Sequence, residues 1–120
     1  MRRCLVVDDE ENLRLVLRTL LSRNGYEVLA AASAEEALSG LERFDPDFVL
    51  ADVRMPGMSG IELGEEIRRR HPGLTVILTS GYSHVLAEEG RHGFELLQKP
   101  YAAEELSRVL LRATRGRSAR

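Results

Sequence analysis

The stretch that decides the fold runs from Arg3 to Gly25 and reads RCLVVDDEENLRLVLRTLLSRNG. Its beginning, Arg3 to Val7, is a short and mainly apolar run that is typical of a buried β-strand. Apolar side chains then recur at intervals of three and four residues, which is the spacing of one face of an α-helix. We expect a strand followed directly by a helix that ends near Gly25. The inward face of this helix is expected to comprise Leu13, Val16, Leu17, Leu20 and Leu21.

The same alternation of a short apolar run and a helical pattern occurs five times along the chain. It predicts an α/β domain in which a parallel sheet carries helices on both faces. Capping boxes of the S-x-x-E type are expected to start helices at Ser33 with Glu36 and at Ser59 with Glu62. The remaining strands are expected at residues 26–30, 48–51, 74–78 and 94–97, and a short helix is expected at residues 85–89. Each later helix is expected to turn one apolar face inward. These faces comprise Ala37, Leu38 and Leu41 in the second helix, Ile61 and Ile67 in the third, and Leu106, Val109, Leu110 and Ala113 in the last.

Length and composition are those of one soluble domain, since 120 residues are enough to bury a core but not to build two. We expect the domain to span residues 1–114 and residues 115–120 to form a basic C-terminal tail. A net charge of −2 argues against nucleic-acid binding, and no apolar run is long enough for membrane insertion. The first residues do not resemble a secretory signal, so the cytoplasm is the expected location. Cys4 lies in a strand pattern and is expected to be a buried thiol without a chemical role.

Acidic residues and a lysine stand where the predicted strands end. Asp8 and Asp9 follow the first strand, Asp52 follows the third, and Lys99 precedes Pro100 after the fifth. The carboxyl ends of parallel strands lie along one edge of the sheet, so these side chains are expected to converge there. Carboxylates that are crowded together repel one another unless a cation offsets their charge. The layout therefore predicts a divalent metal with oxygen ligands, which we expect to be Mg²⁺.

A carboxylate beside a metal ion can attack a phosphoryl group and form an acyl phosphate. We expect Asp52 to be this nucleophile and Lys99 to pair with the phosphoryl oxygens. Asp9 and Asp52 are expected to bind Mg²⁺ directly, together with the backbone carbonyl of Arg54, and Asp8 is expected to bind it through a water molecule. A hydroxyl at the end of the fourth strand, from Ser80 or Thr79, is expected to hydrogen-bond the new phosphoryl group.

A simpler interpretation of the first acids is that they cap the following helix, because Asp favours N-caps and acids suit the first helical turn. Asp9, Glu10 and Glu11 fit that interpretation. It does not account for a further acid at the end of another strand, nor for a lysine before a proline. The joint site is therefore the favoured interpretation.

Four motifs occur together and in order: VVDDE at residues 6–10, ADVRMPGMSG at 51–60, LTSG at 78–81 and QKPY at 98–101. With these motifs the chain closely resembles the receiver domain of bacterial response regulators in two-component signalling, over essentially all residues to about Thr114. The resemblance implies a single flavodoxin-like (βα)5 doubly wound sheet with strand order 2-1-3-4-5. The segments SGYS at residues 80–83 and LLQKPY at residues 96–101 resemble those of receivers attached to hybrid histidine kinases.

The same resemblance implies roles for individual residues. Asp52 would be the phosphoacceptor, Asp8 and Asp9 the acidic metal pair, Lys99 the invariant lysine and Ser80 the switch hydroxyl, with Thr79 as its strand neighbour. Phosphate would come from a phosphohistidine on a histidine kinase or a histidine phosphotransfer protein. Phosphorylation would switch a surface that binds a downstream protein or domain. The chain would then be a signalling module and not an enzyme with a separate substrate.

Two features depart from the family pattern. Receivers usually carry an aromatic residue three positions before the lysine, and this chain has Leu96 there. The segment between Ser80 and Lys99 is also shorter than usual, which places the usual signalling face in question. Arg54 and Tyr82 each lie two residues beyond a site residue, and either they tune the lifetime of the acyl phosphate or they are ordinary loop residues.

Three other functions are compatible with such a sheet. A phosphatase or phosphotransferase would need a second acid two residues after the nucleophile, and Arg54 occupies that place. A flavin carrier would need a first loop that cradles phosphate, which Asp8 and Asp9 would repel. A receiver-like module that binds partners without being phosphorylated would not need the acids and Lys99, although Leu96 is compatible with it.

Overall fold

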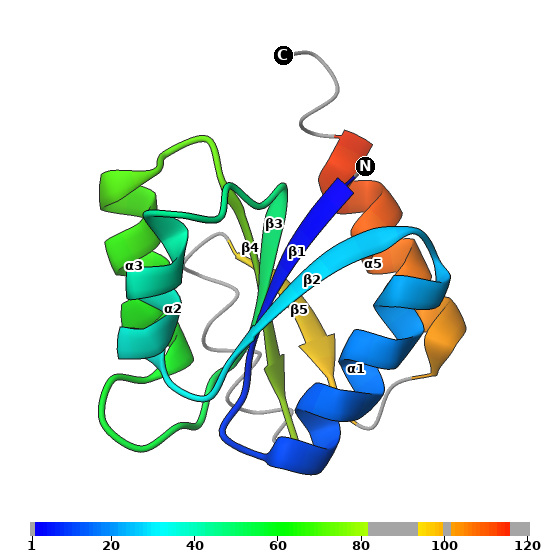
Figure 1. Cartoon of the computed structure of the whole chain (residues 1–120), viewed down its shortest axis with the longest axis horizontal. Helices are drawn as coiled ribbons and strands as arrows, with labels where there is room; N and C mark the ends of the chain where they lie inside the picture. Colours follow the sequence, from blue (N-terminus) through cyan, green and yellow to red (C-terminus); the bar gives the residue numbers. More distant parts are fainter. Residues whose placement is uncertain (1, 82–93, 100–101, 116–120) are drawn as a thin grey trace.

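The computed structural model describes residues 2–81, 94–99 and 102–115, and these residues form a parallel sheet flanked by helices (Figure 1). The five strands lie in the order β2-β1-β3-β4-β5, which confirms the predicted doubly wound, flavodoxin-like sheet. The strands are β1 Arg2–Val7, β2 Tyr26–Ala31, β3 Phe48–Asp52, β4 Thr75–Ser80 and β5 Glu95–Gln98. The helices are α1 Glu11–Arg23, α2 Ala34–Leu41, α3 Gly60–Arg70 and α5 Ala103–Arg115. The short helix expected at 85–89 lies outside the described residues.

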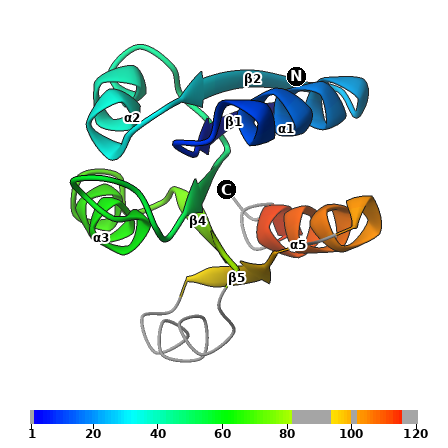
Figure 2. The same cartoon turned by 90° about the horizontal axis from the view of Figure 1, so that it is seen from below.

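Helices α1 and α5 cover one face of the sheet, and α2 and α3 cover the other (Figure 2). The central strands are apolar on both sides because each of them lies between two layers of helices. In β1, Leu5 and Val7 pack with α2 and α3, whereas Cys4 and Val6 pack with α1 and α5. Cys4 is fully buried, as predicted, and burial raises the pKa of its thiol. Two cores therefore form, one on each face of the sheet.

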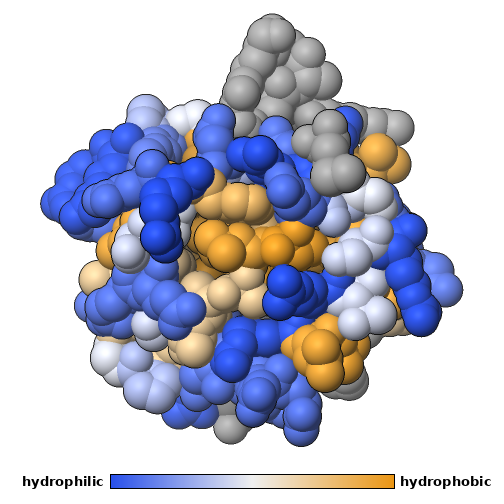
Figure 3. All heavy atoms as spheres, in the orientation of Figure 1, coloured by the Kyte–Doolittle hydropathy of each residue, from blue (hydrophilic) through white to orange (hydrophobic). Residues whose placement is uncertain are grey.

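Among the strands that the structure describes, β2 lies at one edge of the sheet and pairs with β1 alone. Its residues Tyr26, Val28, Leu29 and Ala30 are half-buried. Figure 3 shows apolar surface in the middle of the face on which Figure 1 places β2. The edge position explains why this apolar strand is less buried than the central strands.

Helix α1 buries a narrower stripe than predicted. Leu17 and Leu21 are buried, and Leu13 and Leu20 are half-buried, but Val16 is 53% exposed, so its assignment to the inward face was wrong. Leu13, Leu17 and Leu21 are four residues apart and follow one line along the helix. Val16 is turned by about 100° from Leu17 around the helix axis, which carries it beyond the contact with the sheet.

The two predicted capping boxes differ in structure. In α3, Ser59 accepts a hydrogen bond from the N–H of Glu62, and the Glu62 carboxylate accepts one from the N–H of Ser59, as predicted. In α2, Ser33 accepts from the N–H of Glu36, but the Glu36 carboxylate accepts from the N–H of Ala32. The second box is therefore only half formed, because Glu36 reaches one residue further back than the N-cap.

The inward faces of the other helices agree with the prediction for the side chains that the structure describes, which do not include Ala113. Ala37, Leu41 and Ile67 are buried, while Leu38 and Ile61 are half-buried against the same core. In α5, Leu106, Val109 and Leu110 are buried between the helix and the sheet. Strand β4 extends two residues beyond the predicted end and so includes Thr79 and Ser80. Within the described parts of the chain, no helix combines the length and the apolar character that a membrane span requires.

Candidate functional site

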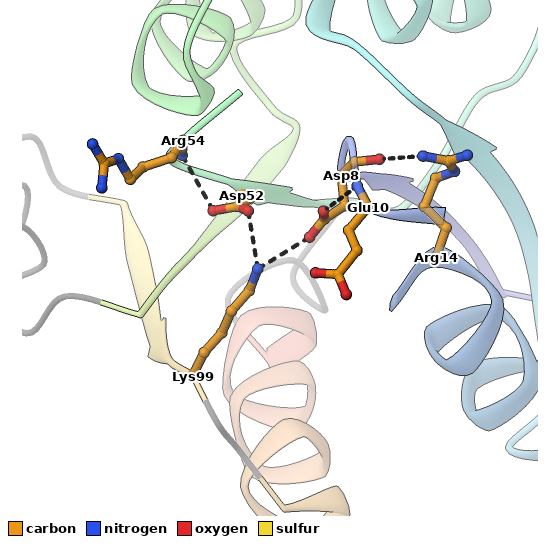
Figure 4. Close-up of polar contacts among 6 residues, drawn as sticks. All are labelled: Asp8, Glu10, Arg14, Asp52, Arg54 and Lys99. Atoms are coloured by element: carbon orange, nitrogen blue, oxygen red, sulfur yellow. Dashed lines mark hydrogen bonds and ion pairs between the residues drawn. The ribbon is translucent and has the colours of Figure 1, made fainter. Parts of the chain in front are cut away.

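The predicted acids and lysine meet at the carboxyl edge of the sheet (Figure 4). Asp8 follows β1, Asp52 ends β3 and Lys99 follows β5. Val7 of β1 pairs with Ala51 of β3 in the parallel ladder, so Asp8 and Asp52, the next residues on each strand, lie beside each other. The strand order thus brings together side chains that are more than 40 residues apart in sequence.

Lys99 bridges the two carboxylates. Its Nζ donates to Oδ2 of Asp8 at 3.1 Å and to Oδ2 of Asp52 at 2.9 Å. The backbone N–H of Lys99 also donates to the carbonyl oxygen of Ser80 at 2.8 Å, which ties the base of this side chain to the end of β4. Lys99 is the only lysine of the chain, whose other 16 cationic side chains are all arginines. A compact ammonium group, rather than a planar guanidinium, thus stands between the carboxylates.

Burial and charge act in opposite directions at this site. Burial raises the pKa of Asp8 above its ordinary value, although a hydrogen bond from the N–H of Glu10 and the charge of Lys99 act to lower it. Burial alone would lower the pKa of Lys99, but the hydrogen bond and charge of Asp52, with a further contribution from Asp8, leave that pKa raised. The pKa values of both groups are therefore raised, and additional positive charge beside Asp8 would stabilise its ionised carboxylate.

Asp9 completes a group of acids that can hold a metal ion. One carboxylate oxygen from each of Asp8, Asp9 and Asp52 lies within 4.8 Å of the other two. This donor set is made of hard anionic oxygens, which are the ligands that Mg²⁺ prefers. No second group of three such ligands occurs among the residues that the structure describes. The donors present therefore fit the ion that the sequence predicts.

The helix-cap interpretation holds for Glu11, which lies in the first turn of α1, but not for the N-cap itself. Helix α1 starts after Glu10, whose side chain makes no capping hydrogen bond. Asp8 instead accepts a hydrogen bond from the N–H of Glu10 through Oδ1, at 2.9 Å, which closes the turn between β1 and α1. The same carboxylate contacts Lys99 through its other oxygen.

The remaining predicted residues lie around Asp52. Thr79 pairs with Asp52 across the ladder between β3 and β4, and Thr79 and Ser80 are both buried. The N–H of Arg54 donates to Oδ1 of Asp52 at 3.2 Å, and Figure 4 shows the Arg54 side chain extending away from Lys99 and Asp8. Tyr82 lies outside the described residues. Asp52 is thus held between the ammonium group of Lys99 and a backbone N–H.

Sequence reasoning missed Arg14. Its Nη1 donates to the backbone carbonyl oxygen of Asp8 at 2.7 Å. A cation near the start of a helix opposes the helix dipole, and this was the available signal for a role outside the helix itself.

The comparisons with known proteins agree with this geometry. Residues 4–111 match the family model of the response regulator receiver domain. The DNA-binding transcriptional regulator NtrC of Klebsiella pneumoniae is 35% identical over 111 residues, covering 90% of this chain and 24% of NtrC. The regulatory protein AtoC of Escherichia coli is 37% identical over 116 residues, covering 94% of this chain and 25% of AtoC. The chain thus spans about a quarter of the length of these curated relatives.

Solved structures show the same similarity over whole domains. A response regulator receiver domain protein from Clostridium thermocellum superimposes with a TM-score of 0.89 and 30% identity, covering 99% of this chain and 98% of that one. The response regulator TrrA of Thermotoga maritima, solved in complex with Mg(2+)-BeF, gives a TM-score of 0.87 and 36% identity, covering 94% of this chain and 99% of TrrA. The chain therefore belongs to the receiver domain family of two-component response regulators.

Proposed function

We propose that this domain accepts a phosphoryl group on Asp52 from a phosphohistidine of a partner histidine kinase or histidine phosphotransfer protein. The observation that carries the proposal is the placement of the Asp52 carboxylate, with Lys99 Nζ at 2.9 Å from one oxygen and the Arg54 N–H at 3.2 Å from the other. Both donors hold the carboxylate in place. Asp52 remains partly exposed, as transfer from a second protein requires.

In the transfer, a carboxylate oxygen of Asp52 forms a bond to phosphorus while the bond from phosphorus to the imidazole nitrogen of the donor breaks. The electron pair of the breaking bond stays on that nitrogen, and the product on this chain is an acyl phosphate. Lys99 stabilises the negative charge on the transferred oxygens because its Nζ lies next to Asp52. The three carboxylates would otherwise repel the incoming phosphoryl group.

Asp8, Asp9 and Asp52, with the backbone carbonyl of Arg54, are the residues that we propose hold Mg²⁺. When bound, Mg²⁺ would supply positive charge to the phosphoryl oxygens and would offset the three acids. The spacing of the carboxylate oxygens supports this assignment, as does the Mg(2+)-BeF complex of the related TrrA.

We assign the response to phosphorylation to the hydroxyl of Ser80 at the end of β4, next to Thr79. Ser80 is buried, and its carbonyl accepts a hydrogen bond from the N–H of Lys99, so it is linked directly to the site. Leu96, which stands where the family usually carries an aromatic residue, is half-buried against the core of α2 and α3. The partner that receives the signal is a downstream protein or domain, and the domain acts as a signalling module rather than on a separate substrate.

The proposal is tested by incubating the protein with Mg²⁺ and acetyl phosphate and measuring its intact mass. We expect a gain of one phosphate in the wild type and none in Asp52→Asn. A matched control is Asp45→Asn, which removes an exposed carboxylate from the turn before β3, at the opposite end of that strand. A second candidate function, partner binding without phosphorylation, would be favoured if the wild type stayed unmodified while binding Mg²⁺.

A further inference from the structure

Arg14 lies near the start of α1 and reaches back to the end of β1. Its Nη1 donates to the carbonyl oxygen of Asp8 at 2.7 Å, and Figure 4 shows the guanidinium group beside that carbonyl. Long side chains on a helix point towards its N-terminus, so this position is well suited to contact the preceding loop. The positive charge opposes the dipole of α1 there, so helix stability does not explain the arginine.

With Arg14, every polar atom of Asp8 has a partner. The N–H of Asp8 donates to the carbonyl of Ala31 on β2, at 3.1 Å. Its Oδ1 accepts from the N–H of Glu10, and its Oδ2 accepts from Lys99. The carbonyl oxygen is the fourth polar atom, and Arg14 is the side chain that satisfies it. A 2% exposed residue with four satisfied polar atoms is held in one orientation.

This orientation bears directly on Asp9. The carbonyl of Asp8 and the nitrogen of Asp9 belong to one planar peptide group, so fixing that carbonyl fixes the direction in which Asp9 leaves the strand. Asp9 is itself exposed, so packing does little to hold its side chain. Yet an oxygen of Asp9 lies within 4.8 Å of oxygens of Asp8 and Asp52. The hydrogen bond from Arg14 is therefore well placed to maintain that arrangement.

We propose that Arg14 is a positioning residue that orients the peptide between Asp8 and Asp9, so that both carboxylates can share one cation with Asp52. This inference deepens the proposed function and rests on it for the identity of the cation. Arg14 acts through the backbone and does not touch the ion or the phosphoryl group.

The test compares Arg14→Met with Arg18→Met, which removes an equal charge from an exposed residue one helical turn further along α1. Mg²⁺ dissociation constants are measured by calorimetry at constant ionic strength. Arg14→Met is expected to bind Mg²⁺ about tenfold more weakly, as is usual when a residue that orients a metal ligand is removed. Arg18→Met is expected to bind like the wild type. Arg14→Lys should recover part of the affinity, because an amine still donates a hydrogen bond.

A second measurement separates positioning from chemistry. At saturating Mg²⁺, phosphate gain of Arg14→Met from acetyl phosphate is expected to approach that of the wild type, because the residues that contact the phosphoryl group are intact. Circular dichroism in the presence of a chelator shows whether Arg14→Met folds. If Arg14→Met does not fold, the comparison of Arg14→Lys with the wild type still tests the inference.

Equal Mg²⁺ affinity in Arg14→Met and Arg18→Met would overturn the inference. Tighter binding in Arg14→Met would also overturn it, since the charge of Arg14 would then matter more than its hydrogen bond. Failure of the proposed function would be recognised separately, because the wild type itself would gain no phosphate.

Discussion

At the scale of single residues, Asp8 is where burial and charge oppose each other most directly. Its side chain is 3% exposed, and burial raises its pKa above the ordinary value of 3.8. A raised pKa in the folded state contributes stability that is complete below pH 3.8 and is lost as the pH rises through the raised pKa. At neutral pH, ionised Asp8 therefore lowers the free energy of unfolding, unless a cation is bound beside it.

Replacing Asp8 by an uncharged side chain of the same shape should relieve this cost. We expect Asp8→Asn to raise the free energy of unfolding at pH 7 without divalent metal, because burying the neutral amide avoids the cost of burying the ionised carboxylate. Urea denaturation at pH 7 and at pH 3 measures the effect, which should disappear at the lower pH because Asp8 is then neutral in the wild type. A less stable variant at pH 7 would contradict this prediction and show that the pairing with Lys99 outweighs burial.

Lys99 should titrate at unusually high pH. Its pKa is raised, so its favourable contribution is complete below the ordinary value of 10.5 and is lost as the pH rises through the raised value. Because Lys99 is the only lysine, its side-chain carbon resonance can be followed in an NMR titration without interference from other lysines. In the wild type we expect a titration midpoint above 10.5. The midpoint should be lower in Asp52→Asn, because this variant removes the largest charge effect that raises the pKa of Lys99. An unchanged midpoint in that variant would show that the two side chains do not interact in solution.

At the scale of elements, the start of α3 fixes the end of β3. Gly60 is the first residue of α3, and its N–H donates to the carbonyl of Val53 at 3.0 Å. A Cβ at this position would overlap the carbonyl oxygen of Asp52 and would lie 2.8 Å from the carbonyl carbon. The helix therefore approaches the backbone of Asp52 more closely than any residue with a side chain permits.

Gly60→Ala should destabilise the protein although alanine favours helices over glycine. We expect a loss of about 1–3 kcal/mol, typical of overpacking, together with slower phosphate gain because Asp52 is displaced. Gly73→Ala is the matched control, since nothing lies within 4 Å of a Cβ there and its φ is not positive. Chemical denaturation and intact mass measure the two effects. Equal stability of the two variants would mean that the helix shifts without cost.

The elements and the main site residues were predictable because they follow from the spacing of apolar residues and from the topology of a parallel sheet. Alternating apolar runs and helical patterns indicate parallel strands, and such strands necessarily bring Asp8, Asp52 and Lys99 to one edge. Periodicity does not show how wide a contact a helix makes, which is why Val16 was assigned wrongly to the core. The bond from Arg14 to Asp8 depends on the path of the loop between β1 and α1, and no residue pattern encodes that path.

At the scale of the whole molecule, metal binding and folding should be linked, because the acids that would bind Mg²⁺ come from different parts of the chain and meet only in the folded state. A ligand that binds only the folded state at about 100 times its dissociation constant adds about 2.7 kcal/mol to the free energy of unfolding. For a domain of this size we expect Mg²⁺ to raise the Tm by on the order of 10 °C. Calorimetric scans with Mg²⁺, and with NaCl at equal ionic strength, measure the shift. Asp9→Asn should lose this shift while staying folded, because Asp9 is exposed and its proposed role is to bind the ion and not to pack in the core. An equal rise in Tm in that variant would place the ion elsewhere.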